Sequence, residues 1–132
     1  MKPHNVTLTI TSLLSVLLAS FHLSDDIVLG IEPGGVSNFN GILILAGYLF
    51  ATLMLDGRRW AHAIVLLVSM GAAVVPYLHM TGVGLVGGRV ANADGKFFWV
   101  WTLMALGVTA MVSVILSAQG LWRLLRGRGA TS

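Results

Sequence analysis

Four long stretches without a single charged residue dominate this chain, at 6–24, 37–55, 60–80 and 97–118. A helix needs about 20 apolar residues to cross the roughly 30 Å of hydrocarbon in a bilayer. Because lipid offers no hydrogen bonds to the backbone, such a stretch must be helical to satisfy its own amide groups. The four stretches therefore predict four membrane-spanning helices.

Composition supports a membrane protein. Of the 132 residues, 56% are hydrophobic and only 10% are charged, whereas soluble domains carry about 25% charged residues. A chain this short has too little interior to bury so much apolar surface. We expect an all-α fold, an integral membrane four-helix antiparallel bundle that forms a single domain over 1–132. Its helices are predicted at approximately 6–29, 37–55, 60–80 and 97–125.

The distribution of basic residues predicts the orientation, since cytoplasmic loops carry the excess of Lys and Arg. Six basic residues fall on one side of the predicted helices and two on the other. Both termini are therefore expected in the cytoplasm, with the chain a multi-pass protein of the cell membrane. The six are Lys2, Arg58, Arg59, Arg123, Arg126 and Arg128, and the two are Arg89 and Lys96. Aromatic anchors are expected at the outer interface, at Phe97, Phe98, Trp99 and Trp101.

Charge and cysteine content narrow the function classes. The formal net charge of +3 does not indicate nucleic-acid binding, because topology explains six of the eight basic residues. The expected partners are the lipid bilayer and other membrane proteins, or further copies of the chain. With no cysteine, disulfides, thiolate metal sites and thiol redox chemistry are excluded.

Small and polar residues recur at spacings of three and four on the predicted helices. This is the spacing of an inward face in a left-handed bundle, where small side chains let membrane helices approach closely. For the Ser, Thr, Ala and Gly positions, packing is the preferred interpretation. The faces include Ser12, Ser15, Ala19, His22 and Asp26 on the first helix, His62, Ser69, Ala72, Pro76 and His79 on the third, and Thr102, Ala105, Thr109 and Ser113 on the fourth.

Ionisable residues within these faces call for a different interpretation, because such groups are costly in a membrane and usually functional. His22 lies inside the first predicted span, and Asp25 and Asp26 follow three and four residues later, within reach of it. His79 closes the third helix at the same end. We therefore predict a ligand or metal site at His22, Asp25, Asp26 and His79, with the metal at His22, Asp26 and His79. The alternative is a hydrogen-bonded buried histidine beside carboxylates that mark the helix end.

Imidazole and carboxylate groups together suit zinc, iron, copper or manganese, so the candidate cofactors are a transition metal or haem. A polar mouth is predicted above the site on the two outer loops. It comprises Glu32, Asn40, Arg89 and Asp94.

Three function classes are compatible with these patterns. The first is a small membrane protein with a ligand, metal or cofactor site at the extracytoplasmic end of the bundle, and it is the preferred one. The second is a structural or assembly subunit of a membrane complex, and the third is an oligomeric proton or cation transporter. Whether the protein is an enzyme stays open, because no nucleophile or substrate pocket is identifiable from the sequence.

Overall fold

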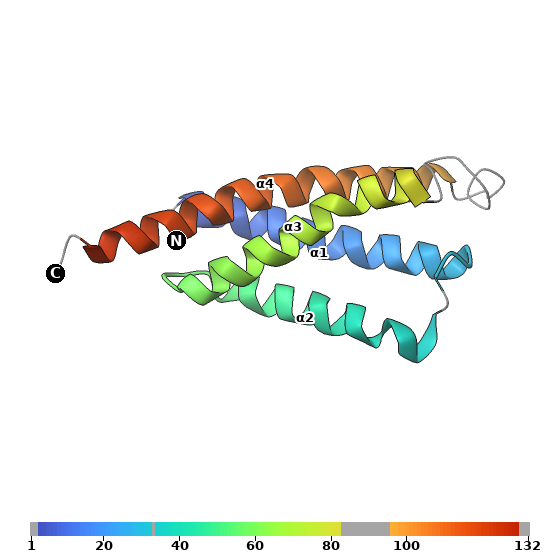
Figure 1. The fold of residues 1–132 in the computed structure, drawn as a ribbon, viewed down its shortest axis with the longest axis horizontal. Coiled ribbons are helices and arrows are strands. Elements are labelled where there is room, and N and C mark those ends of the chain that lie inside the picture. Colours follow the sequence, from blue (N-terminus) through green and yellow to red (C-terminus); the bar gives the residue numbers. More distant parts are fainter. Residues whose placement is uncertain (1–2, 33, 83–95, 130–132) are drawn as a thin grey trace.

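The computed structural model describes residues 3–32, 34–82 and 96–129, which form helices and turns and no strand. Four α-helices follow one another: α1 (Pro3–Val28), α2 (Phe39–Leu53), α3 (Arg59–Gly82) and α4 (Lys96–Gly129). A short 3-10 helix, η1 (Gly35–Asn38), precedes α2. Figure 1 shows the four helices lying lengthwise beside one another. The all-helical prediction is confirmed for the described part of the chain.

Three of the four described helices are long and apolar enough to cross a membrane, through the segments His4–Val28, Arg59–His79 and Phe97–Gly127. The 15 residues of α2 are also apolar, but they give a length of about 22 Å, which is shorter than the hydrocarbon layer. Large apolar side chains such as Leu67 and Val108 are exposed on the outer faces. These features indicate a membrane protein.

Glycine turns shorten α2 at both ends relative to its predicted bounds of 37–55. Before it, Gly34 and Gly35 have φ angles of 64° and 79°, a left-handed conformation that glycine adopts readily and that does not continue a helix. After it, Gly57 has a φ angle of 66° in the turn to α3. The other three helices begin one to three residues before their predicted starts at 6, 60 and 97. In addition, α3 and α4 continue two and four residues beyond their predicted ends at 80 and 125.

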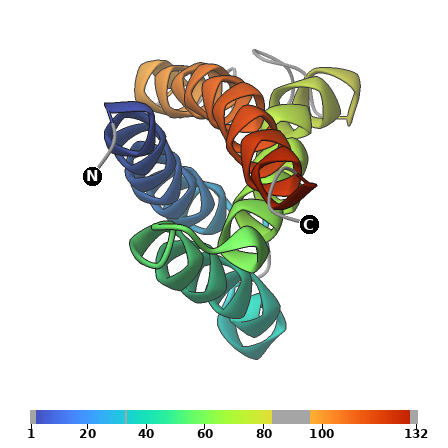
Figure 2. The ribbon, with the colours of Figure 1, turned by 90° about the vertical axis from the view of Figure 1, so that its left-hand side faces the viewer.

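The helices form a ring in the order α1, α2, α3, α4, so that the first helix also packs against the last. Figure 2 shows this ring end-on, viewed along the long axis of the molecule. The interfaces of α4 with α3 and with α1 are the most extensive, whereas α2 packs less closely against α1 and α3. Among the described residues, α2 makes no contact with α4. The most closely packed part of the structure is therefore formed by α4 with α1 and α3 on either side of it.

Hydroxyl groups join neighbouring helices along the predicted inward faces. Ser15 Oγ of α1 donates a hydrogen bond to Thr109 Oγ1 of α4 at 3.0 Å. Tyr48 Oη of α2 and Ser69 Oγ of α3 are hydrogen-bonded at 2.7 Å. Such bonds satisfy polar groups that lipid cannot. The predicted inward orientation is confirmed for the fully buried serines Ser12, Ser15, Ser69 and Ser113.

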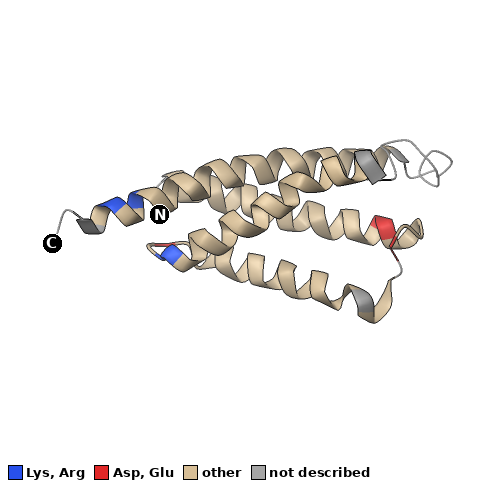
Figure 3. Cartoon of the chain, viewed as in Figure 1, with Lys and Arg blue, Asp and Glu red and all other residues tan. Residues whose placement is uncertain are grey.

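The described charged residues lie near the ends of the helices, and the middle of each helix carries none (Figure 3). The end that holds both chain termini is also where α3 begins and α4 ends, which brings Arg59 and Arg126 there. The opposite end, where α1 finishes, holds Asp26 and Glu32. Over the side chains that the structure describes, the end with the termini is therefore net basic, although Asp56 lies there in the turn before α3, and the opposite end is acidic.

Gly107 of α4 allows a close approach to Pro76 of α3. A Cβ atom added to Gly107 would lie 2.8 Å from the Pro76 Cγ, well inside the normal separation of carbon atoms. The proline ring is rigid and cannot turn away. Any larger side chain at Gly107 would therefore push α3 and α4 apart.

We predict that Gly107→Ala lowers the free energy of unfolding by about 1 to 3 kcal/mol, because the added methyl overpacks this helix contact. The measurement is the unfolding midpoint of the purified protein in detergent. Gly47→Ala on α2 is the matched control, since a Cβ there meets no atom within 4 Å. Equal midpoints for the two variants would contradict the close contact.

Candidate metal centre

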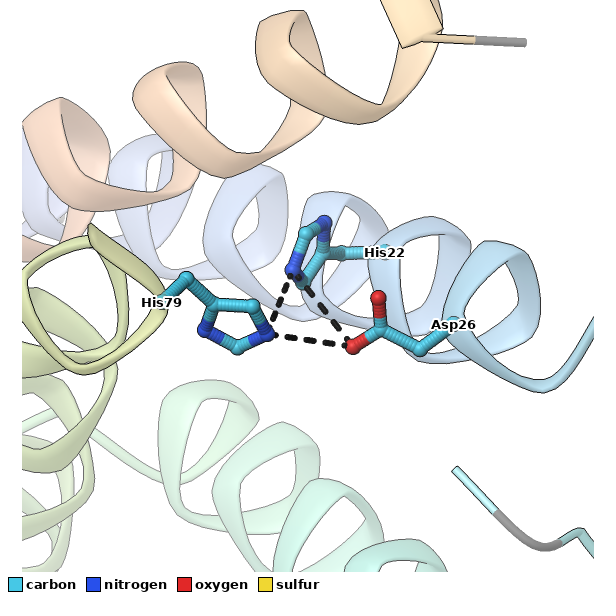
Figure 4. A group of neighbouring side chains, drawn as sticks. All are labelled: His22, Asp26 and His79. Carbon is cyan, nitrogen blue, oxygen red and sulfur yellow. Dashed lines mark hydrogen bonds and ion pairs between the residues drawn. The ribbon is translucent and has the colours of Figure 1, made fainter. Parts of the chain in front are cut away.

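Two histidines and one aspartate converge between α1 and α3. His22 and Asp26 lie one turn apart on α1, so their side chains leave the helix on the same face. His79 belongs to the last turn of α3. Figure 4 shows the three side chains pointing towards one another. The structure thus brings together the three residues for which the sequence predicts metal binding.

The three facing atoms form a nearly equilateral triangle. The His22 Nε2 atom lies 3.4 Å from the His79 Nε2 atom and 3.6 Å from the Asp26 Oδ2 atom. The remaining side, between His79 Nε2 and Asp26 Oδ2, measures 3.3 Å. His22 and Asp26 are buried, with 3% and 4% of their surfaces exposed. The triangle is therefore largely shielded from its surroundings.

These separations match the ligand spacing around a small tetrahedral ion. Bonds of about 2.0 to 2.1 Å in tetrahedral geometry place ligand atoms about 3.3 to 3.4 Å apart. An octahedral ion with equally short bonds would hold adjacent ligands about 2.8 to 3.0 Å apart. The triangle is closer to the tetrahedral value. A tetrahedral ion there would have three protein ligands and one open position.

In each histidine, the Nδ1 atom is hydrogen-bonded away from the triangle, so that the Nε2 atom is the one available to bind a metal. His79 Nδ1 donates to the carbonyl of Val75 at 3.0 Å. His22 Nδ1 lies 3.3 Å from Thr102 Oγ1, whose own proton goes to the carbonyl of Trp99 at 3.1 Å. The Thr102 oxygen therefore accepts from His22. In the neutral form of both histidines, with one proton on each Nδ1 atom, each Nε2 atom presents a lone pair to the centre. The 3.3 Å contact of His79 Nε2 with Asp26 Oδ2 is a hydrogen bond only when His79 is also protonated on Nε2.

Trp99 of α4 completes the support. Its indole Nε1 donates to Asp26 Oδ1 at 2.6 Å, which orients the other carboxylate oxygen, Oδ2, towards the histidines. The indole is fully buried, and its ring lies 5.3 Å from that of His22 and 5.5 Å from that of His79, centre to centre. The sequence predicts Trp99 as one of the aromatic anchors at the membrane interface, whereas the structure buries it fully. Its position three residues before Thr102, on the inward face of the fourth helix, was the signal that it is buried.

Three electron-pair donors thus face one another across a small gap. Within the described residues, the ion-pair partners of Asp26 are His22 and His79 and include no Lys or Arg. A buried carboxylate needs compensating positive charge. A metal ion would satisfy all three donors together, whereas one proton on an imidazole would bridge only one pair at a time.

A cavity of about 600 Å³ adjoins the triangle between α1, α2 and α3. All three candidate ligands line it, and most of its other lining residues are apolar. Ile44 of α2 and Leu67 of α3 line it while being more than half exposed, at 55% and 68%. The cavity therefore extends from the candidate metal centre to the outer surface between α2 and α3.

The other predicted site residues have different outcomes. Asp25 is half-buried on α1 and does not join the group of three. Its Oδ2 atom has no hydrogen-bond partner among the residues that the structure describes. Glu32 lines the cavity. The backbone N–H groups of Ile31 and Glu32 both donate to the carbonyl of Asp26, which turns the chain back after α1. Asn40 is exposed at the start of α2. Arg89 and Asp94 lie outside the described residues.

No protein-family model matches this chain, and no curated protein or solved structure is significantly similar to it. The function must therefore be inferred from the geometry of its own residues. The feature that carries most chemical information is the His22, Asp26 and His79 triangle with its hydrogen-bonded supports.

We predict that Trp99→Phe lowers the affinity of the candidate centre for added zinc about 10- to 100-fold, because the Asp26 carboxylate loses the indole N–H that orients it. Competition with a chelating indicator measures the affinity in detergent. Trp101→Phe is the matched control, since Trp101 lies on the same helix with 59% of its surface exposed. Similar affinities for both variants would rule out the supporting role of Trp99.

Proposed function

We propose that this protein binds a transition-metal ion, with zinc as the best fit, between His22, Asp26 and His79 at the extracytoplasmic end of a membrane-embedded four-helix bundle. The observation that carries the proposal is the triangle of two Nε2 atoms and one carboxylate oxygen, 3.3 to 3.6 Å apart. Each corner is oriented by a further hydrogen bond, as is usual for protein metal ligands.

The ligand set favours a bare ion over haem. Haem iron offers protein ligands only its two axial positions, on opposite faces of the ring. Three donor atoms within 3.6 Å of one another instead surround a single point. Two imidazoles and a carboxylate are also the ligand set of several catalytic zinc sites, in which the fourth position holds water or substrate.

A proton relay is the second candidate, favoured by the 3.3 Å contact between His79 Nε2 and Asp26 Oδ2. A protonated His79 would form an ion pair with the aspartate there. That arrangement leaves the His22 Nε2 lone pair directed at the same point without a proton of its own. Metal content distinguishes the two candidates, because a relay needs no metal.

The proposal includes the full topology, in which α2 also crosses the cell membrane and both termini are cytoplasmic. Two observations support it. Among the side chains that the structure describes, the arginines gather at the end that holds the termini, as the excess of basic residues in cytoplasmic segments predicts. The second helix runs beside α1 and α3 within the ring, and η1 extends its helical segment by four residues. The metal site would then lie on the extracytoplasmic side.

We predict that the protein, purified without a histidine tag and supplied with zinc, retains close to one equivalent of zinc by elemental mass spectrometry. His22→Ala and His79→Ala should each lose most of it, because two remaining ligands hold zinc poorly. His4→Ala is the control, since His4 bonds the carbonyl of Leu116, far from the site. Metal-free wild-type protein, or equal zinc in all four proteins, would refute the proposal.

The topology can be tested by labelling single introduced cysteines, because the chain has no native cysteine that would react as well. We predict that Val36→Cys, between α1 and α2, reacts with a membrane-impermeant maleimide in intact cells. Asp56→Cys, in the turn between α2 and α3, should react only after the membrane is permeabilised. Both positions are exposed in the structure. The reverse pattern would invert the orientation, and labelling of both in intact cells would exclude α2 as a membrane crossing.

A further inference from the structure

The two faces of the metal triangle have different surroundings. On the α4 side, the buried Trp99 indole packs against both imidazole rings. On the other side, His22, Asp26 and His79 line the cavity between α1, α2 and α3. An ion held by three protein ligands therefore has its open coordination position directed into the cavity. Whatever binds there reaches the metal through this space.

The cavity is elongated along α1 and mostly apolar. Along α1 its lining runs from Ser15 to Asp26, a distance of about 16 Å at 1.5 Å per residue. Its volume of about 600 Å³ is in the range of cavities that hold a small organic molecule. The hydroxyl of Tyr48, at the end away from the metal, is already bonded to Ser69. Ser15, which also lines the cavity, is bonded to Thr11 and Thr109. Among the described lining residues, the unused polar interaction therefore lies at the end that holds His22, Asp26 and His79.

Charge determines what kind of head group fits. A divalent ion with one carboxylate and two neutral imidazoles has a formal charge of +1, which is costly to leave uncompensated in an apolar site. A single anionic oxygen donor in the fourth position would neutralise it. Glu32 lines the same cavity but is exposed, and it does not belong to the group of ligand atoms. Its carboxylate acts on His79 only as a nearby charge, and it leaves the fourth position itself open to an anionic oxygen donor.

We propose that the cavity binds a long-chain monocarboxylate, a fatty acid, whose carboxylate occupies the fourth position on the metal and whose alkyl chain lies between α2 and α3. This inference rests on the proposed metal site. An extended chain with C–C bonds of about 1.5 Å advances about 1.3 Å per carbon, so about twelve carbons fill the 16 Å. The exposed lining residues Ile44 and Leu67 mark where such a molecule enters from the bilayer.

The test uses cobalt(II) in place of zinc, because its visible absorption reports changes in coordination. Cobalt-loaded protein in a non-ionic detergent is titrated with dodecanoate and, separately, with acetate. Gly71→Leu adds bulk to the cavity about two turns of α3 away from the ligand His79. Gly71 lines the cavity, and a Cβ there meets no atom within 4 Å. Gly47→Leu is the control, because that position is equally open and lies outside the cavity lining.

We expect dodecanoate to change the cobalt spectrum and Gly71→Leu to weaken its binding on the order of tenfold, with cobalt affinity unchanged. Gly47→Leu should match the wild type. Because the detergent is the same throughout, comparing variants cancels partitioning of dodecanoate into micelles. If dodecanoate leaves the spectrum unchanged, or binds Gly71→Leu as well as wild type, the fatty-acid proposal fails while the metal site stands. Failure to bind cobalt at all would overturn both proposals.

Discussion

The buried carboxylate of Asp26 is the interaction on which this structure most depends. An ionised carboxylate in an apolar environment costs several kcal/mol unless it is paired and hydrogen-bonded. Here one oxygen accepts the indole N–H of Trp99 from α4, and the other faces His22 of α1 and His79 of α3. One side chain thereby ties together three of the four helices. The same requirement for positive charge makes this position suitable for a metal ion.

The remaining packing keeps those three helices in place. Gly107 lets α4 approach Pro76 of α3, and Ser15 and Thr109 join α1 to α4 through their hydroxyl groups. The second helix supplies no candidate ligand and packs less closely. Its apolar side chains instead form one wall of the cavity beside the candidate metal site. A closely packed frame thus holds the ligands, while a looser helix leaves room for a bound molecule.

Much of this arrangement was predictable from the sequence. Charge-free stretches gave the approximate helix positions, and the four-residue spacing of His22 and Asp26 put both on one face of α1. The supporting groups were harder to predict, because they depend on which residues of α4 lie opposite α1. Its sequence position predicts Trp99 as an interfacial anchor, since aromatic residues commonly occupy that depth, whereas the structure buries it fully. The sequence predicts both Asp25 and Asp26 as site residues. Which of the two carboxylates faces His79 depends on the rotation of α1 about its axis, and the structure places Asp26 there.

X-ray absorption at the zinc edge tests the central claim most directly, because it reports the ligands around the ion itself. The account predicts a tetrahedral first shell of nitrogen and oxygen at about 2.0 Å, with outer scattering from two imidazole rings. In Asp26→Asn the zinc should be bound more weakly, with both imidazoles retained. A six-coordinate shell of oxygen atoms, or scattering from fewer than two imidazoles in the wild-type protein, would contradict the site described here.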